Sequence, residues 1–289
     1  MLGIRQVTVA IPASIASDTP HLREKTAKLG SIARSCSIFG VDQIVLYPDD
    51  LQTHQRENLN LCEEILRFIE TPQYLRKRLF KMSPSLKYVG ILPPLQIPSH
   101  NVAKLIRECK PSDWREGVVT SRKKNLLVMD VGLEFPLECE GELQVGTRAT
   151  VELTSIGKES LSGKLIDRSV TGSPLYWGYR VRTQKTSLGE MLEKEKSALK
   201  IGTSRYGQKL EDAWSQIVIM FNERSSVMIT FGSPRFGLQE ILRKEGKNPR
   251  DVFDVFVNFV PGQETLTVRA EEALTITLAT LNNVRSVRG

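Results

Sequence analysis

Two glycines in the last third of the chain have the spacing of a phosphate-binding loop, G-x-x-x-x-G. Gly232 and Gly237 stand in "VMITFGSPRFGLQEIL" (227–242), between a β-branched run and a helical pattern. A loop of this kind that binds a nucleoside triphosphate continues with Lys for the phosphates and Ser or Thr for Mg²⁺. Leu238 and Gln239 occupy those two positions. The turn therefore has the shape of a ligand-binding loop without the residues for triphosphate chemistry.

A second loop that contains Gly and Pro follows the next predicted strand, in "NFVPGQETLTVRAEEA" (258–273). Ligands of parallel α/β sheets bind at the carboxyl ends of the strands, so the two loops together form the candidate pocket. Neither loop contains a set of carboxylates for a metal, a nucleophile elbow, or an acidic residue placed for ribose recognition. What remains is backbone contact with a neutral or zwitterionic ligand.

Metal chemistry and histidine-based catalysis are disfavoured. The four cysteines are scattered without a C-x-x-C pair, and only three histidines accompany them. We expect reduced, buried thiols and no metal site.

The elements that must position these loops alternate between strands and helices. A strand is predicted at 5–11, a helix within 17–40 capped by Ser17 or Asp18, a strand at 41–47, and one or two helices within 58–80, broken near Pro72. Short joins between such elements indicate a parallel α/β layer.

The middle of the chain has a different sequence pattern. Three prolines within 90–100 exclude a helix and a central strand there. Short β runs separated by Gly, Asn, Asp and Ser turns then follow in 114–182. They predict a small all-β barrel of OB-like character, inserted into the α/β domain. The predicted domains are 1–112, 113–183 and 184–289.

The last part of the chain returns to the α/β pattern. The predicted elements are a charged helix at 188–200, a short strand that ends at 204, a helix at 211–224, a strand at 227–231, a helix at 236–244, a strand at 252–260 and a final helix at 268–283.

Composition sets the broad class. A length of 289 residues suggests about two domains, and no stretch is apolar for long enough to span a membrane. The amino terminus has no signal-peptide pattern, so we expect a soluble, cytoplasmic protein. The formal net charge of +7 favours a polyanionic partner without proving one.

The order of these motifs resembles the SPOUT class of S-adenosylmethionine-dependent RNA methyltransferases. The resemblance rests on strand–"FGSPRFGL"–helix, then strand–"NFVPGQETLTVRAEEAL"–helix, and on "GSIARSCSIFGVDQIVLY" (30–47) in the amino-terminal half. Together with "VTVAIPAS", "GILPPL" and "IGTS", these stretches are similar to the archaeal and eukaryotic family of RNA methyltransferases with an OB-like insert. The resemblance implies a trefoil knot in the last strands, a homodimer, and methylation of RNA, with a ribosomal RNA base such as uridine N3 as the target.

The resemblance also implies how the loops hold S-adenosylmethionine. Gly232 and Gly237 would let the backbone approach the cofactor, and Pro234 would stiffen the loop; a plain strand–helix turn is the alternative. Gln263 and Ser204 would face the same pocket. The implied cofactor-binding set is Thr203, Phe231, Gly232, Ser233, Pro234, Gly237, Asn258, Val260, Pro261, Gly262, Thr265 and Thr267.

Two arginines are candidates for catalysis on the same analogy. Arg34 would bind a phosphate of the target nucleotide or stabilise charge during methyl transfer, although a solvated helix face is the ordinary role of such a residue. Arg269 begins the last helix, beside the predicted cofactor loop. Glu271 and Glu272 follow it, and favourable charge at a helix amino terminus is their simpler explanation.

Basic residues mixed with aromatics predict an RNA surface in the insert. Aromatic rings can stack on unpaired bases while cations meet phosphates, but alternate positions of a barrel strand must also face its core. "YLRKRLFK" (74–81) adds a second basic patch. The candidate RNA-binding residues are Arg122, Lys123, Lys124, Tyr176, Trp177 and Arg180.

Three functions remain open from the sequence. The first is an active RNA methyltransferase, and the second is a SPOUT-fold RNA-binding or ribosome-assembly protein without catalysis. The third, a nucleotide-hydrolysing enzyme, is opposed by Leu238 and Gln239 in the glycine loop.

Overall fold

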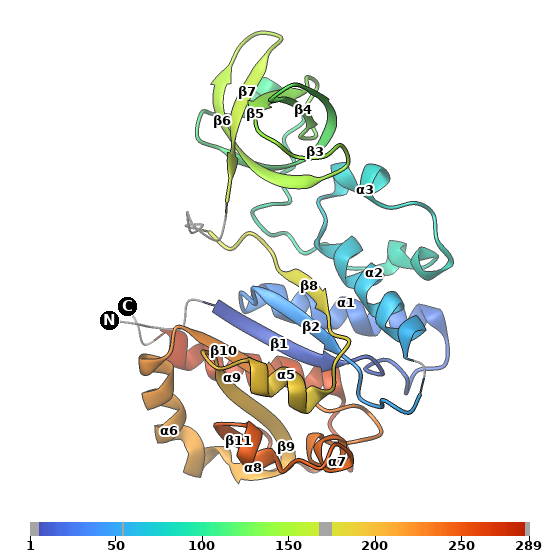
Figure 1. The fold of residues 1–289 in the computed structure, drawn as a ribbon, viewed down its shortest axis with the longest axis vertical. Helices are drawn as coiled ribbons and strands as arrows, with labels where there is room; N and C mark the ends of the chain where they lie inside the picture. The colour runs from blue at the N-terminus through green and yellow to red at the C-terminus, as the bar shows by residue number, and fades with distance from the viewer. Residues whose placement is uncertain (1–5, 54, 168–174, 287–289) are drawn as a thin grey trace. The chain divides into compact units, whose positions relative to one another are not determined.

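The computed structural model describes residues 6–53, 55–167 and 175–286, which form two compact units (Figure 1). We call them the sheet unit and the barrel unit. The sheet unit is drawn from Met1–Ile69, Pro84–Pro94 and Tyr179–Gly289, and the barrel unit from Glu70–Ser83 and Leu95–Gly178.

The sheet unit is built on six strands that are all parallel, in the order β11-β9-β10-β1-β2-β8. This arrangement confirms the predicted parallel α/β layer. The predicted first strand included Arg5, which lies outside the described residues. The strands are β1 (Gln6–Pro12), β2 (Gln43–Tyr47), β8 (Arg180–Thr183), β9 (Leu199–Lys209), β10 (Ser226–Thr230) and β11 (Val255–Asn258).

Helices on both faces cover this sheet, as a parallel sheet requires. The predicted break near Pro72 is confirmed, because one helix ends at Glu70 and the next begins at Gln73. The helices that belong to or lead out of the sheet unit are α1 (Leu22–Ile38), α2 (Arg56–Glu70), α5 (Leu188–Lys194), α6 (Leu210–Glu223), α7 (Leu238–Lys244), α8 (Pro249–Val252) and α9 (Ala270–Ser286).

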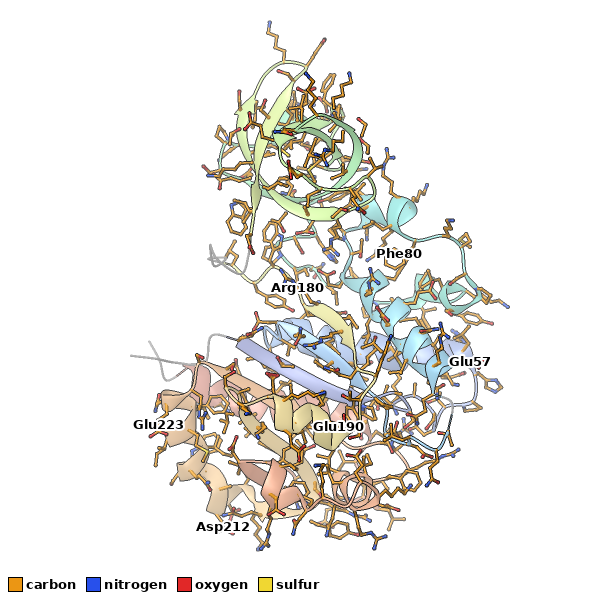
Figure 2. All side chains as sticks on the ribbon, viewed as in Figure 1. Glu57, Phe80, Arg180, Glu190, Asp212 and Glu223 are labelled. Atoms are coloured by element: carbon orange, nitrogen blue, oxygen red, sulfur yellow. The ribbon has the colours of Figure 1, made fainter. Side chains whose placement is uncertain are left out.

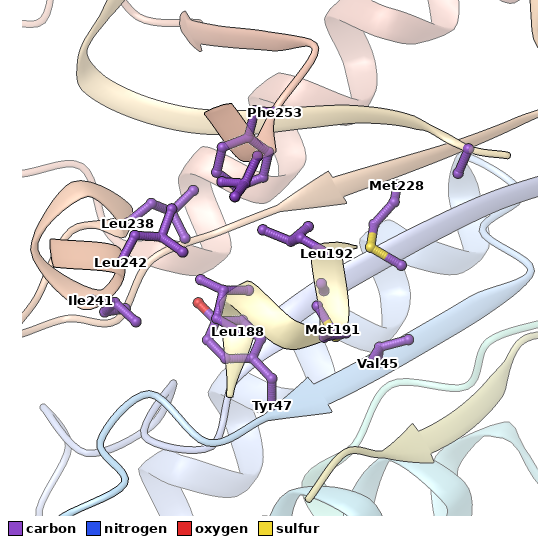
Figure 3. Close-up of a cluster of buried hydrophobic side chains, with 13 residues drawn as sticks. Val45, Tyr47, Leu188, Met191, Leu192, Met228, Leu238, Ile241, Leu242 and Phe253 are labelled. Carbon is purple, nitrogen blue, oxygen red and sulfur yellow. The ribbon is translucent and has the colours of Figure 1, made fainter. Parts of the chain in front are cut away.

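Alternate residues of the strands supply the two cores of the sheet unit. On one face, Ala10 and Met228 pack with buried side chains of α5 and α7, among them Leu192 and Leu242 (Figure 3). On the other face, Val7, Val227 and Ile229 lie with apolar residues of α6 and α9. This alternation follows from the two-residue period of a strand. Charged residues of α6, such as Asp212 and Glu223, are exposed (Figure 2).

The barrel unit contains a closed five-stranded barrel, in the order β3-β4-β5-β7-β6. All neighbouring pairs are antiparallel except β5 with β7, which are parallel, and β6 pairs with β3 to close the barrel. The predicted all-β barrel is therefore confirmed. Its strands are β3 (Trp114–Lys123), β4 (Leu126–Asp130), β5 (Leu137–Glu140), β6 (Arg148–Ile156) and β7 (Leu161–Ile166).

The last barrel strand was wrongly predicted. The β run at 176–182 does not close the barrel: Arg180–Thr183 is strand β8, which pairs in parallel with β2 at the edge of the six-stranded sheet. The fifth barrel strand is β5, where Leu137 and Cys139 are buried and the two glutamates between and after them are exposed. A strand of four residues carries too weak an alternation to stand out in the sequence.

The proline-rich segment and the residues on either side of it, 80–113, contain only short 3-10 turns, at Pro84–Leu86, Val89–Ile91 and Ile106–Glu108. Helix α3 (Gln73–Leu79) precedes them in the barrel unit. Among the described residues, no helix has the length and apolar character needed to cross a membrane.

Candidate functional site

The predicted pocket residues gather at one edge of the sheet. Strands β9, β10 and β11 are parallel neighbours, so the segments that follow β10 and β11 leave the sheet at the same, carboxyl, edge. These segments are residues 231–237 and 259–269, which we call the β10 loop and the β11 loop. The two glycine-bearing turns singled out in the sequence are thus brought together by strand order.

The β10 loop is held from both sides at its first residue. Phe231 is 2% exposed, its backbone N–H donates to the carbonyl of Ala10 at 3.0 Å, and its carbonyl accepts from the hydroxyl of Tyr47 at 2.6 Å. Burial, then the negative charges of Asp49 and Glu245, raise the pKa of Tyr47 well above its ordinary value. Tyr47 therefore remains a neutral donor that fixes the start of the loop.

Ser233 closes the turn that follows. Its backbone N–H donates to the Phe236 carbonyl at 2.8 Å, and its hydroxyl accepts from the Phe236 N–H at 2.9 Å. A Cβ on Gly232 would lie 3.0 Å from the Leu238 nitrogen, which is a tight fit, whereas a Cβ on Gly237 would meet no atom within 4 Å. Packing inside the chain therefore favours glycine at position 232 and leaves open space at position 237. Pro234 is exposed on the same turn.

Side chains of the β11 loop bind mainly to the loop itself. Asn258 Oδ1 accepts from the Val260 N–H at 2.9 Å, and Thr265 Oγ1 donates to the Thr267 carbonyl at 3.0 Å. Gln263 Nε2 donates to the carbonyl of Thr265 at 2.7 Å. These side chains shape the loop, so the groups it presents to a ligand are largely those of its backbone.

The tip of the β11 loop is open. Pro261 and Gly262 are exposed, and a Cβ on Gly262 would meet no atom within 4 Å. Position 262 therefore resembles position 237, since neither glycine is required by contacts within the described chain.

Strand β9 contains a feature that sequence reasoning missed. Its pairing with β11 moves from Gly202 opposite Phe256 to Gln208 opposite Val257, so residues 203–207 bulge out of the ladder. We call these residues the β9 bulge. Thr203, a predicted cofactor residue, donates its hydroxyl hydrogen to the Thr230 carbonyl at 3.0 Å. The strand was predicted to end at residue 204, and only Gly207 hinted at the bulge.

The two candidate catalytic arginines lie on α1 and just before α9, two helices that pack together. Arg34 is half-buried on α1 and its Nη1 donates to the Pro94 carbonyl at 3.2 Å. Arg269 is exposed just before α9, and its backbone N–H donates to Glu272 at 2.9 Å. Ser35 and Thr275 join α1 to α9 through their hydroxyls, 2.7 Å apart.

A buried lysine also joins these helices. Lys28 on α1 lies 2.8 Å from Asp18 and 3.1 Å from Glu271 on α9. Burial alone would raise the pKa of Asp18, but the hydrogen bond and charge of Lys28 lower it below its ordinary value. Asp18 was predicted as a helix cap, which is wrong: α1 begins at Leu22, after Pro20. No spacing in the sequence indicates the contact between Lys28 and Glu271.

The candidate RNA-binding residues are divided between the two units. Arg122, Lys123 and Lys124 are exposed around the turn between β3 and β4, where Arg122 Nε donates to the Lys124 carbonyl at 2.7 Å. Tyr176 is half-buried in the barrel unit, and Arg180 is exposed on β8 of the sheet unit (Figure 2).

Trp177 has a structural role in the barrel unit. It is 7% exposed, its indole N–H donates to Glu116 at 2.6 Å, and its ring meets Trp114 edge to face. A base cannot stack on a ring in this position without a rearrangement of the unit.

Glu116 also belongs to a buried ionic network that sequence reasoning missed. Arg148 lies 2.6 Å from Glu116 and 2.7 Å from Glu70. Burial alone would lower the pKa of Arg148, but the charges of Glu70 and then Glu116 raise it above its already high ordinary value. The network joins the end of α2 to strands β3 and β6, residues that are far apart in the sequence.

Comparison with known proteins gives a family match along almost the whole chain. A family described as "Putative RNA methyltransferase" matches residues 6–281. An uncharacterized protein from Halobacterium salinarum is 28% identical over 95% of this chain and 98% of its own length. The "28S rRNA (uridine-N(3))-methyltransferase" of Homo sapiens is 30% identical over 95% of this chain and 77% of its own length.

One solved structure also aligns over the full length. It is the SpoU methyltransferase AviRb from Streptomyces viridochromogenes in complex with AdoMet, with 11% identity, coverage of 100% of this chain and 61% of that chain, and a TM-score of 0.35. That TM-score is too low to establish a shared fold.

Proposed function

Because this chain belongs to the family described as "Putative RNA methyltransferase", we propose that it transfers a methyl group from S-adenosylmethionine to N3 of a uridine in ribosomal RNA. The family resemblance drawn from the two glycine loops is confirmed by the match over residues 6–281. The uridine target follows the relative from Homo sapiens, whose name specifies that atom.

One structural observation carries the proposal: two open, glycine-bearing loops leave the sheet at the same carboxyl edge. A Cβ on Gly237 or Gly262 would project into open space, so a ligand can approach the backbone there. The buried hydroxyl of Thr230, at the end of β10, has no hydrogen-bond partner within the described ranges. An unpartnered buried hydroxyl at a strand end is consistent with a polar ligand bound beside it.

The residues present at this edge fit S-adenosylmethionine. The β10 loop would hold it through the backbone of Phe231, Gly232 and Gly237, and the β11 loop through the backbone of Val260 and Gly262. Ser233, Asn258, Thr265 and Thr267 would keep the loops in shape through the contacts described above, and Thr203 and Pro261 would line the same edge. When bound, S-adenosylmethionine supplies a methyl group made electrophilic by its sulfonium sulfur.

The chain itself has to position the acceptor and stabilise charge. N3 of uridine carries a proton, which would pass to water. The N3–C bond would form as the bond between the methyl carbon and sulfur breaks, with S-adenosylhomocysteine released, so the acceptor is an anion or becomes one. Arg34 and Arg269 are the cations that we assign to this charge, because α1 and α9 pack together and Arg269 is the last residue of the β11 loop. A fixed guanidinium would favour the deprotonated uridine without acting as a base.

RNA would be held by exposed cations of the barrel unit and of β8. Arg122, Lys123 and Lys124 are exposed at the β3–β4 turn, and Arg180 is exposed on β8. Tyr176 remains a candidate for stacking, whereas buried Trp177 is assigned to the interior of the barrel unit. The net charge of +7 supports a polyanionic partner.

The strand orders support the finer parts of the fold proposal. The proposed SPOUT sheet has a trefoil knot at its carboxyl end: β11 pairs with β9 on the side away from β10, so the chain that leaves β10 must pass β9 to reach its place. The barrel order β3-β4-β5-β7-β6 with parallel β5 and β7 supports an OB fold. A crystal structure in which the backbone path contains no knot would contradict this proposal.

We also propose a homodimer in the cytoplasm, as the family resemblance implies. Light scattering should give twice the chain mass of 32.5 kDa, and a monomer at micromolar concentration would contradict the dimer. Cell fractionation tests the cytoplasmic location. Recovery of the protein from another compartment alone would contradict that location.

The central experiment is calorimetry of S-adenosylmethionine binding to wild type and Gly237→Val. The new side chain would enter the open space at position 237, so we expect the variant to lose cofactor binding and keep its circular-dichroism spectrum. Gly90→Val is the matched control, because a Cβ there also meets no atom within 4 Å and Gly90 belongs to the 3-10 turn Val89–Ile91, which is part of neither loop. Unchanged binding by Gly237→Val would show that the pocket lies elsewhere.

The substrate is tested by mass spectrometry of ribosomal RNA from cells that lack the protein. Loss of one N3-methyluridine is the expected result, and its restoration by wild type but not by Gly237→Val links it to the proposed pocket. An unchanged set of modified nucleotides would contradict the ribosomal assignment.

A further inference from the structure

The β9 bulge exposes an aromatic ring beside a cation at the carboxyl edge of the sheet. Tyr206 is 70% exposed, and the guanidinium carbon of Arg205 lies 4.8 Å from the centre of its ring. An exposed tyrosine with an arginine against it presents a flat face and a positive charge together. Strand β9 also carries Lys209 and contains no carboxylate between Leu199 and Lys209.

The backbone of the bulge is fixed by several contacts. Asn258 Nδ2 donates to the Arg205 carbonyl at 3.1 Å, and Ser204 Oγ accepts from the Tyr206 N–H at 3.2 Å. A Cβ on Gly207 would lie 2.6 Å from the carbonyl carbon of Val257, so glycine is needed for the close approach to β11. These contacts therefore fix the backbone that carries the exposed ring of Tyr206.

The bulge also touches the β11 loop. Arg205 Nη1 donates to the Leu266 carbonyl at 3.4 Å, which places the cation next to the loop assigned to the cofactor. A five-residue departure from the parallel β9–β11 ladder gives up backbone pairing there. Smaller β-bulges are over-represented next to active sites, where they change the direction of a side chain. Tyr206 and Arg205 are the side chains re-aimed here.

On the basis of the proposed function, we propose that Tyr206 stacks on an unpaired base of the substrate RNA, beside the target uridine, and that Arg205 meets the adjacent phosphate. A ring paired with a cation suits a single-stranded polyanion. A second copy of this chain is the competing occupant of the surface, and the charge of β9 is less suited to it, since two copies would bring like charges together.

The test measures RNA binding by full-length protein with Tyr206→Ala and Tyr206→Phe. The probe is a short uridine-rich single-stranded RNA with a fluorescent label, and S-adenosylhomocysteine is present throughout. We expect Tyr206→Ala to weaken binding by roughly 5- to 150-fold, the effect of losing one base–aromatic stack, and Tyr206→Phe to remain near wild type. Cofactor affinity should be the same in all variants.

Tyr88→Ala is the matched control, because Tyr88 is a half-buried tyrosine in the same unit that also has a cation, Lys87, 5.3 Å from its ring centre. It should bind RNA like wild type. Ultraviolet cross-linking of the RNA with 5-bromouridine should in addition attach it to the peptide that contains residues 199–209.

The outcomes separate this inference from the proposed function. Methyl transfer by wild type with unchanged RNA affinity in Tyr206→Ala would overturn the stacking and leave the function standing. Tyr206-dependent binding without any methyl transfer would support the stacking and count against the function. Absence of RNA binding by wild type, or a halved particle mass in Tyr206→Ala, would overturn the stacking.

Discussion

The ammonium group of Lys28 forms two ion pairs, one with Asp18 before α1 and one with Glu271 at the start of α9. The lysine side chain is 5% exposed, against 37% for Asp18 and 18% for Glu271. Replacing it leaves two carboxylates beside each other without their cation. The loss in free energy of unfolding should lie between the value for breaking an exposed ion pair and the value for breaking a buried one.

We predict that Lys28→Met lowers the free energy of unfolding by about 1–3 kcal/mol at neutral pH. The folded-state pKa of Asp18 lies below its ordinary value of 3.8, so its contribution is present above that value and is lost as the pH falls through the folded pKa. The difference between wild type and variant should therefore narrow below about pH 4. Urea unfolding of wild type and Lys28→Met at several pH values measures this difference in the free energy of unfolding.

Arg23→Met is the control for Lys28→Met, since Arg23 is exposed on the same helix. A variant at position 28 that unfolds like wild type and like this control would show that the buried contacts contribute nothing.

At the scale of secondary-structure elements, the ionic network around Arg148 ties Glu70, the first residue of the barrel unit, to two barrel strands. Glu70 is 5% exposed and Glu116 is 2% exposed. Glu116 also accepts hydrogen bonds from Thr150 and Trp177, each at 2.6 Å. Removal of the arginine would take away its ion pairs with two buried carboxylates, which is far more costly than the loss of a surface pair.

We predict that Arg148→Met lowers the free energy of unfolding of the barrel unit by about 3–5 kcal/mol. Tryptophan fluorescence during urea unfolding is a suitable probe, because Trp114 and Trp177 are both in that unit. Lys164→Met is the control: Lys164 lies 3.3 Å from Glu152 with 58% of its side chain exposed, so its loss should cost at most about 1 kcal/mol. Equal effects of the two substitutions would refute the special role of the network.

The sequence predicts elements better than it predicts their partners. The strand–helix pattern identified β1, β2, β10 and β11 because buried parallel strands are long apolar runs. It misplaced β8, whose alternation is the same whether it pairs in a barrel or at a sheet edge. The site shows the same division, since the glycine loops are local patterns and could be predicted. Lys28–Glu271 and Arg148–Glu70 could not, because they depend on which elements meet.

At the scale of the whole molecule, β8 returns the chain from the barrel unit to the sheet unit. Its backbone pairs with β2, Tyr179 donates to the Leu66 carbonyl at 2.9 Å, and Thr183 donates to Glu63 at 2.9 Å. These contacts make residues 179–183 part of the sheet unit, although the sequence pattern grouped them with the insert.

We predict that two deletions of the barrel differ in their effect on the sheet unit. Replacing residues 113–178 by a flexible Gly/Ser linker retains β8 and should preserve cofactor binding while weakening RNA binding. Replacing residues 113–183 removes β8 and exposes the edge of β2, so the thermal unfolding temperature should fall further. Calorimetry and thermal unfolding measure both effects, and identical behaviour of the two deletions would show that β8 is dispensable.

The place of β1 in the sheet affects how the protein is made. β1 is the first of the six sheet strands to be synthesised, yet it lies between β2 and β10, and Gln6 is the partner of Ser226. At common rates of synthesis its second neighbour appears roughly 10–40 s later, while the barrel unit is translated. During that interval Val7, Val9 and Ile11 form an apolar strand with one open edge. The nascent chain should therefore depend on chaperones that shield this edge until β10 arrives.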